Sequence, residues 1–228
     1  VRVNLTGTLQ PGVMARDVFH HLVRVMGPAS CRFQVLELGG PGLSQISTEG
    51  LQTITGLAMF TGAITAIVNP DAERLAYALP RARKKIEPLY SDEDAHYAAV
   101  YDIDLSDLEP VIVIPPTPAN TRDLKDYLGL DVQVGYLGSC ASGRLEDLRV
   151  AAKILEGRQV APGFQLNVIP TSQEIMAAAA NEGLIGTLVA AGAFVSSPSC
   201  DYCFGRIATM TKKQRAVSTG TLNVRGRM

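Results

Sequence analysis

Segments with a strand pattern alternate with segments with a helix pattern along most of this chain. Residues 1–7, VRVNLTG, alternate apolar and polar side chains as a strand does, and residues 11–27 then carry Val18, Leu22 and Val25 at helical spacing. Further strand patterns cover residues 31–40 and 64–68, and a helix pattern that opens with serine and threonine lies between them at 47–63. Such alternation predicts an α/β fold with mostly parallel sheets.

The second half repeats this alternation with apolar residues of its own. Strand patterns cover residues 110–116, 131–139 and 164–170, and helix patterns cover 144–157 and 171–184. Between the halves, a stretch near residues 80–101 is rich in charge and weakly periodic, as surface connections are. We therefore predict two α/β domains, residues 1–80 and 106–228, joined by a connecting segment at 81–105.

The composition excludes several classes of protein. Hydrophobic residues make up 46% of the chain and charged residues 19%, which is ordinary for a globular protein. A net charge of -1 offers no basic field for nucleic acid. The longest apolar stretch, 184–195, is broken by glycines and too short to cross a membrane, and the chain does not start with a signal peptide. We expect a cytoplasmic protein and, because the first residue is valine, a piece of a longer chain.

Three of the four cysteines fall in two loops flanked by glycine. Cys140 lies in LGSCASGR, and Cys200 and Cys203 lie in SPSCDYCFGR. Cys140 also lies where a predicted strand ends and a helix begins, which is where sites form in parallel sheets. This odd number of thiols is the strongest functional signal in the sequence.

Five interpretations of these thiols are possible. A disulfide framework needs an even number of cysteines in a secreted chain, and a redox CxxC would leave Cys140 without a role. Structural zinc needs a fourth ligand, which would come from one of the distant histidines His20, His21 or His96. Ordinary buried thiols are usually found in apolar runs, whereas two of these three lie among glycine and proline. The remaining interpretation is an iron–sulfur cluster with three protein thiolates, whose fourth iron is open to an oxygen of a substrate.

The motifs LGSCASGRLEDLRVAAKILEGRQV and CDYCFG resemble those of the aconitase superfamily, and most closely the large subunit of 3-isopropylmalate dehydratase. LTGTLQPGVMARDVFHHLVRVMG, LELGG, DLSDLEPVIVIPP and STGTLNVRGRM follow the same order. The resemblance implies an aconitase-like fold and a [4Fe-4S] hydro-lyase whose cluster ligands are Cys140, Cys200 and Cys203. Cys31 matches no ligand and is expected to be a small strand residue.

The resemblance covers only the second and third domains of the family's cluster-bearing body. It implies two further parts outside this chain: the first domain of the body, and a swivelling domain or small subunit that brings the catalytic base. In this chain itself the catalytic residues stay unknown. Arg144 and Asp147, close after Cys140, are expected to fix the cluster loop or cap the helix.

Several positions depart from the family pattern. Gly56 and Phe60 replace an asparagine and a glutamate, and Thr221 and Leu222 replace an asparagine and an arginine. Arg227 is retained and could hold a carboxylate with a forked pair of hydrogen bonds, so Arg227 and Thr221 are the predicted substrate-binding residues.

Leu222 and Phe60 favour a small hydroxy acid with one or two carboxylates and a neutral substituent over citrate. The expected function is therefore an iron–sulfur hydro-lyase acting on such an acid. Two alternatives stay open, namely a catalytically degenerate cluster-bearing scaffold or sensor, and a zinc-stabilised binding module.

Overall fold

The structure, a computed structural model, describes residues 1–200, 203, 205, 210–211, 213–221 and 226. The chain divides into two compact units: unit 1 comprises Val1–Ile112 and Thr121–Leu124, and unit 2 comprises Val113–Asn120 and Lys125–Met228. The predicted domain limits stay a prediction, since compact units need not fold independently.

Unit 1 is built on a four-stranded sheet in the order β3-β2-β1-β4. The strands are β1 (Arg2–Thr6), β2 (Val35–Gly39), β3 (Thr65–Val68) and β4 (Val100–Asp104). Every neighbouring pair is parallel. In β1 the buried side chains of Val3 and Leu5 alternate with the half-buried ones of Arg2 and Asn4. This alternation makes one face of the sheet apolar and the other polar.

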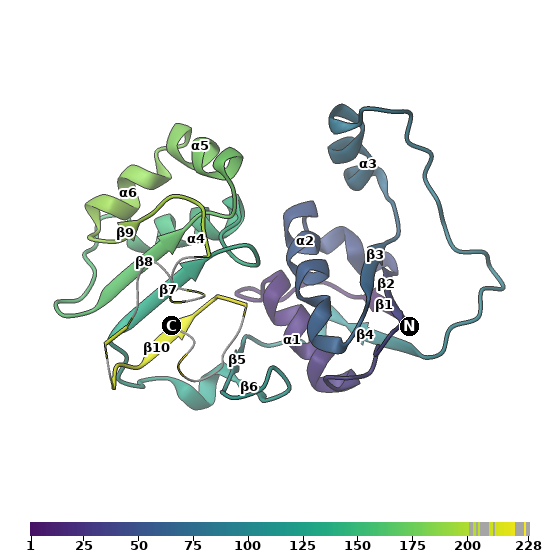
Figure 1. Cartoon of the computed structure of the whole chain (residues 1–228), viewed down its shortest axis with the longest axis horizontal. Helices are drawn as coiled ribbons and strands as arrows, with labels where there is room; N and C mark the ends of the chain where they lie inside the picture. The colour runs from purple at the N-terminus through teal and green to yellow at the C-terminus, as the bar shows by residue number, and fades with distance from the viewer. Residues whose placement is uncertain (201–202, 204, 206–209, 212, 222–225, 227–228) are drawn as a thin grey trace. The chain divides into compact units, whose positions relative to one another are not determined.

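Helices α1 (Ala15–Met26) and α2 (Thr48–Leu57) pack against each other in unit 1 (Figure 1). The α2 helix begins where Ser47 accepts a hydrogen bond from the Gly50 amide at 2.9 Å. The shorter α3 (Ala72–Ala78) begins in the same way at Asp71, which accepts from the Arg74 amide at 2.9 Å. The predicted helices at 11–27 and 47–63 are thus confirmed, with shorter limits.

One predicted strand needs a correction. The strand expected at 31–40 begins only at Val35, and Cys31 lies in the turn before it. Cys31 is nevertheless completely buried, and its amide donates to the Thr61 carbonyl at 2.9 Å. It is therefore a small buried residue, but not a strand residue.

Short elements complete the part of the chain that the structure describes. A two-stranded sheet pairs β5 (Val111–Val113) with β6 (Thr121–Asp123). The residues 82–99 have no helix or strand, whereas β4, which falls inside the segment expected to connect two domains, belongs to the sheet of unit 1. Short 3-10 helices cover Pro41–Gln45, Ala58–Thr61, Leu79–Arg81, Leu105–Asp107 and Leu124–Tyr127.

Unit 2 has a second parallel sheet in the order β10-β7-β8-β9. Its strands are β7 (Val134–Gly138), β8 (Gln165–Ile169), β9 (Phe194–Val195) and β10 (Ala216–Ser218), and its helices are α4 (Leu145–Leu155), α5 (Gln173–Asn181) and α6 (Leu184–Ala190). The sequence patterns predicted β7, β8, α4 and α5 but missed α6, β9 and β10.

All three helices share one apolar core with the sheet of unit 2. This core brings together Leu148 and Ala152 of α4, Val168 of β8, Ala179 of α5 and Leu188 of α6. Leu137 of β7, which pairs with Val168, packs against the same core. The neighbours Tyr136 and Ile169 therefore point to the opposite face of the sheet, because side chains alternate along a strand.

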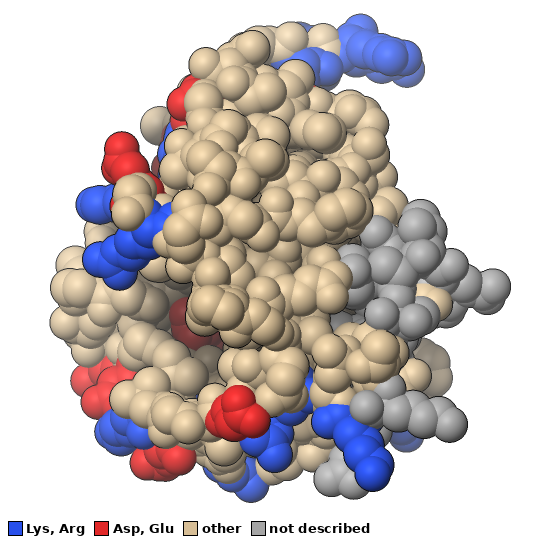
Figure 2. Space-filling view, turned by 90° about the vertical axis from the view of Figure 1, so that its left-hand side faces the viewer, with Lys and Arg blue, Asp and Glu red and all other residues tan. Residues whose placement is uncertain are grey.

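Charged side chains are sparse on the face of unit 2 shown in Figure 2. Between residues 173 and 195 only Glu174 and Glu182 carry charge. Glu182 forms an ion pair with Arg149 at 2.6 Å, and this pair links α5 to α4. Among the helices that the structure describes, none is both long and apolar enough to span a bilayer.

Candidate functional site

Three loops meet at the carboxyl edge of the unit 2 sheet, where β7, β8 and β10 end. The loop after β7 carries Cys140, the one after β8 carries Thr171, and the one after β10 carries Thr221. Because the strands are parallel, their carboxyl ends lie side by side at one edge. The structure thus confirms that Cys140 lies between a strand end and a helix start.

The loop of Cys140 packs tightly against the end of β8. The Thr171 hydroxyl donates to the Ser139 carbonyl, and the Thr171 amide donates to the Gly143 carbonyl, both at 2.8 Å. A Cβ atom on Gly143 would come within 2.3 Å of the Ile169 carbonyl oxygen. Only glycine fits this close approach, which explains one of the two glycines that flank Cys140.

Arg144 and Asp147 hold the start of α4. The Arg144 amide donates to Asp147 Oδ2 at 2.9 Å, and Arg144 Nη2 donates to the Cys140 carbonyl at 3.1 Å. The prediction that these two residues fix the cysteine loop and cap the helix is confirmed. The loop is therefore held both from β8 and from α4.

The three thiols differ in exposure. Cys140 and Cys200 are exposed, while Cys203 is buried on the sheet face opposite the helices, where it packs with Tyr136 and Ile169. Cys203 Sγ lies 3.3 Å from the Thr221 hydroxyl. Thr221, predicted to bind substrate, is thus placed beside a cysteine sulfur.

Tyr136 packs with Cys203 on the face of the sheet opposite the helices. Its pKa is raised to about 12, mainly by burial; a hydrogen bond with the Ser139 side chain opposes the rise, and the charges of Cys203, Cys140 and Cys200 add to it. The contacts of the described residues thus place one of the three thiols, Cys203, against this phenol.

Among the residues that the structure describes, no three His, Cys, Asp or Glu side chains converge closely enough to hold a single metal ion. A structural zinc needs four ligands at one point. In a cluster, by contrast, each thiolate binds a different iron, so the sulfurs surround the group without converging. The assignment of Cys140, Cys200 and Cys203 as ligands stays a prediction.

The other departures from the family pattern have different surroundings. Phe60 lies near Phe19 of α1, with ring centroids 6.5 Å apart and the rings tilted by 54°, and so has a packing role in unit 1. Gly56 lies exposed on α2, where an added Cβ would meet no atom within 4 Å. Leu222 and Arg227 lie outside the described residues, and the role of Arg227 stays a prediction.

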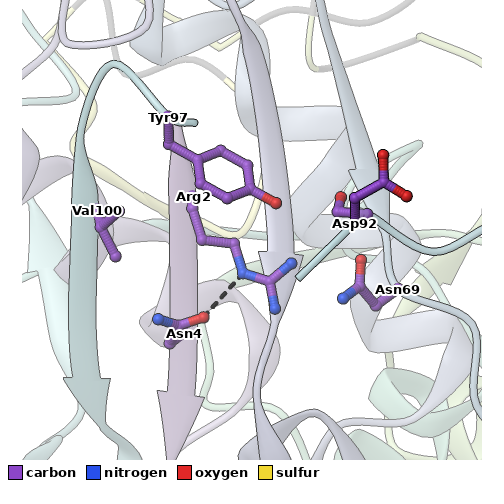
Figure 3. Close-up of a pocket in the computed structure, with 7 residues that line it drawn as sticks. Arg2, Asn4, Asn69, Asp92, Tyr97 and Val100 are labelled. Carbon is purple, nitrogen blue, oxygen red and sulfur yellow. Dashed lines mark hydrogen bonds between the residues drawn. The ribbon is translucent and has the colours of Figure 1, made fainter. Parts of the chain in front are cut away.

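A polar cavity of about 300 Å³ lies in unit 1, lined by Arg2, Asn4, Asn69, Ser91, Asp92, Tyr97 and Val100 (Figure 3). Arg2 forms an ion pair with the buried Glu37 and donates through Nε to Asn4 at 2.8 Å. The hydroxyls of Ser91 and Tyr97 donate to the same Glu37 carboxylate at 2.8 and 3.1 Å. This network anchors residues 82–99 on the sheet, and the Arg2 charge is already balanced by Glu37.

The histidines considered as zinc ligands lie in unit 1. His21 Nε2 lies 3.0 Å from the Glu109 carbonyl oxygen, and His20 is buried with neither ring nitrogen hydrogen-bonded. Burial, together with the smaller effect of the Arg16 and His21 charges, lowers the pKa of His20 to about 3. His20 is therefore neutral at physiological pH.

Tyr136 and Thr171 are the site residues that sequence reasoning missed. Tyr136 occupies an apolar run that predicts a core strand, and Thr171 was interpreted only as part of a helix start. Their position beside the cysteines depends on the pairing of β7 with β8, which no local pattern reports.

Comparisons with known proteins agree with this arrangement. The family model for the aconitase family (aconitate hydratase) matches residues 1–129 and 125–228. The 3-isopropylmalate dehydratase large subunit 1 of Pyrococcus abyssi is 37% identical over 97% of this chain, and the large subunit from Moorella thermoacetica is 38% identical over 97%. The chain spans about half the length of these relatives, 53% in both cases.

Among solved structures, aconitase X of Thermococcus kodakaraensis in its holo-form matches 98% of this chain and 48% of its own, with a TM-score of 0.52 and 13% sequence identity. At this identity the match concerns the fold alone, which is the predicted α/β fold with mostly parallel sheets. The family model and the dehydratase relatives, by contrast, cover almost the whole length of the sequence. The chain therefore belongs to the aconitase family.

Proposed function

We propose that this chain forms the cluster-holding part of a [4Fe-4S] hydro-lyase that acts on a small hydroxy carboxylic acid. The observation that carries the proposal is the position of Cys140 in the loop at the carboxyl end of β7, with Cys203 packed against Tyr136 of the same strand. The names of the relatives, 3-isopropylmalate dehydratase large subunits, support a hydro-lyase.

The thiolates of Cys140, Cys200 and Cys203 would each hold one iron. When bound, the cluster supplies one iron without a protein ligand, a Lewis acid toward a hydroxyl oxygen. The exposure of Cys140 and Cys200 supports access of a substrate from solvent. Thr171 and Arg144 keep the Cys140 loop in place through the Ser139 and Cys140 carbonyls.

The retained Arg227 would grip a carboxylate of the substrate, and Leu222 would face a neutral substituent. The base that removes the proton would come from parts outside this chain, a swivelling domain or small subunit, with the first domain of the cluster-bearing body completing the site. The coverage of about half of each relative is consistent with such missing parts.

Anaerobic reconstitution with iron and sulfide tests the cluster. We expect a brown protein with about four irons per chain. Changing Cys140, Cys200 or Cys203 to serine should abolish the visible absorbance, while Cys31→Ala, the matched control at a buried thiol in unit 1, should keep it. A colourless protein with one bound zinc would refute the cluster and support the zinc-stabilised module.

A second candidate function is a cluster-bearing scaffold or sensor without turnover. The packing of Phe60 against Phe19 favours it, because this position then serves the core of unit 1 and cannot move a proton. Turnover of alkyl-substituted hydroxy diacids by the reconstituted chain, with the missing parts supplied, separates the two functions. An intact cluster without turnover would favour the scaffold.

A further inference from the structure

Cys203 has closer protein contacts than the other two thiols of the candidate site. It is 3% exposed and packs with Tyr136 and Ile169, whereas Cys140 and Cys200 are exposed. Its sulfur lies 3.3 Å from the Thr221 hydroxyl, within hydrogen-bonding distance for sulfur. A protein hydroxyl group is therefore already in place at this sulfur.

The position of Thr221 is set by the backbone of two strands. Thr219, two residues earlier, donates from its amide to the Tyr136 carbonyl at 2.9 Å and accepts from the Gly138 amide at 3.0 Å. The Gly220 amide donates to the Ser218 hydroxyl at 2.9 Å. These bonds tie the segment after β10 to the end of β7, so Thr221 reaches Cys203 from a fixed backbone.

The ring of Tyr136 is held equally firmly. It is 2% exposed, and a Cβ atom on Gly220 would approach its Cε1 atom to 3.0 Å. A phenol O–H is a hydrogen-bond donor, and Tyr136 packs with Cys203 and Ile169. The ring therefore brings a hydroxyl group to the side of the sheet on which Cys203 lies.

We propose that Thr221 and Tyr136 are positioning residues for the iron–sulfur cluster, with the Thr221 hydroxyl donating to the Cys203 thiolate and the Tyr136 hydroxyl supplying a second donor on the side of the sheet where Cys203 packs. This inference rests on the proposed function. It gives Thr221 a role beside or instead of the predicted contact with substrate, and it gives the buried Tyr136 a role that packing alone does not require.

Hydrogen bonds to the sulfurs of a cluster stabilise its more electron-rich, reduced form and so raise its reduction potential. Removing a donor should lower the potential. The oxidised form then becomes more accessible, and the cluster should be lost faster in air. Both effects can be measured without any catalytic turnover.

The test uses the whole chain with its cluster reconstituted anaerobically. Thr221→Val removes the hydroxyl at nearly constant shape, Thr221→Ser keeps a hydroxyl, and Tyr136→Phe removes only the phenol oxygen. Thr187→Val on α6 and Tyr127→Phe are matched controls at other places in unit 2. The readouts are the iron content, the midpoint potential from a redox titration followed by electron paramagnetic resonance, and the half-life of the visible absorbance in air.

For Thr221→Val we expect a tenfold shift of the one-electron equilibrium toward the oxidised form, about 59 mV, and a severalfold shorter half-life in air. Tyr136→Phe should shift both in the same direction, while Thr221→Ser and the controls should match the wild type. Unchanged potentials in Thr221→Val and Tyr136→Phe, at full iron content, would overturn this inference and leave the proposed function standing. A wild-type chain that takes up no cluster would overturn both.

Discussion

Arg144 Nη2 donates a hydrogen bond to the carbonyl oxygen of Cys140 at 3.1 Å, so the residue that begins α4 also holds the cysteine loop before it. The Asp147 carboxylate completes this connection by accepting from the Arg144 amide at 2.9 Å. The first cysteine of the candidate site is thereby tied to a helix rather than to a free loop.

Arg144→Ala should weaken cluster retention. Groups that orient a metal ligand contribute about 10-fold to 100-fold in metal affinity, so we expect at least tenfold faster loss of iron to a chelator. The measurement is the rate of bleaching after addition of the chelator under anaerobic conditions. Arg158→Ala, an exposed arginine just after α4, is the control and should bleach at the wild-type rate. Equal rates for all three proteins would show that this bond does not hold the loop.

Glu37→Gln should destabilise unit 1. The change leaves the Arg2 guanidinium without its charged partner in a network that is nearly buried, which costs about 3–5 kcal/mol. The Ser91 and Tyr97 hydroxyls also lose the carboxylate to which they donate. Urea unfolding should report the loss of stability, and limited proteolysis should cut faster within residues 82–99.

The exposed pair between Arg149 and Glu182 provides the comparison for Glu37. Glu182→Gln breaks this ion pair on the surface of unit 2, where solvent screens the charges. We expect only a small change in the urea midpoint. A similar loss of stability in both variants would contradict the structural role of the Glu37 network.

His20 should make the chain sensitive to acid. Its pKa is lowered to about 3 in the folded chain, mainly by burial, against about 6.5 when unfolded. Above pH 6.5 both states are neutral and no penalty arises. Between pH 6.5 and 3 only the unfolded state takes up the proton, so the free energy of unfolding decreases as the pH is lowered. At pH 5 it should be about 2 kcal/mol smaller than at neutral pH.

His20→Leu should remove this part of the acid dependence. Urea unfolding at pH 7 and pH 5 gives the difference in stability between the two conditions, which should shrink by about 2 kcal/mol in the variant. His96→Gln, which changes an exposed histidine, should keep the wild-type difference. If His20→Leu kept it too, His20 would not be neutral and buried as described.

Gly56→Ala should stabilise unit 1. Gly56 lies on α2 with no atom within 4 Å of an added Cβ, so alanine gains helix propensity without a clash, about 0.5 kcal/mol. Gly40→Ala is the opposite case, because Gly40 has φ +91° and an added Cβ would lie 2.4 Å from the Leu5 carbonyl oxygen. Urea unfolding should therefore shift to higher urea for the first and to lower urea for the second.

The sequence by itself determined the elements whose periodicity is strong. The strands at β1, β7 and β8 and the helices α1, α4 and α5 follow from alternating or helical apolar patterns, because side-chain direction repeats with a fixed period in each. The sequence did not predict the short strands β9 and β10, because two or three residues are too few to show an alternating pattern. The α6 helix was also not predicted, because its apolar stretch is broken by glycine.

The sequence also identified Cys140, Cys200 and Cys203 as the candidate ligands, through their number and their glycine-rich surroundings. Only the tertiary structure decided what surrounds them. Tyr136 meets Cys203 because β7 pairs with β8 and points this side chain away from the helices, and Thr221 meets Cys203 because β10 pairs with β7. Such contacts join residues that are not close in the sequence, 18 positions apart for Cys203 and Thr221 and more for Tyr136 and Cys203. Local patterns cannot encode them, since they depend on which strands become neighbours in the sheet.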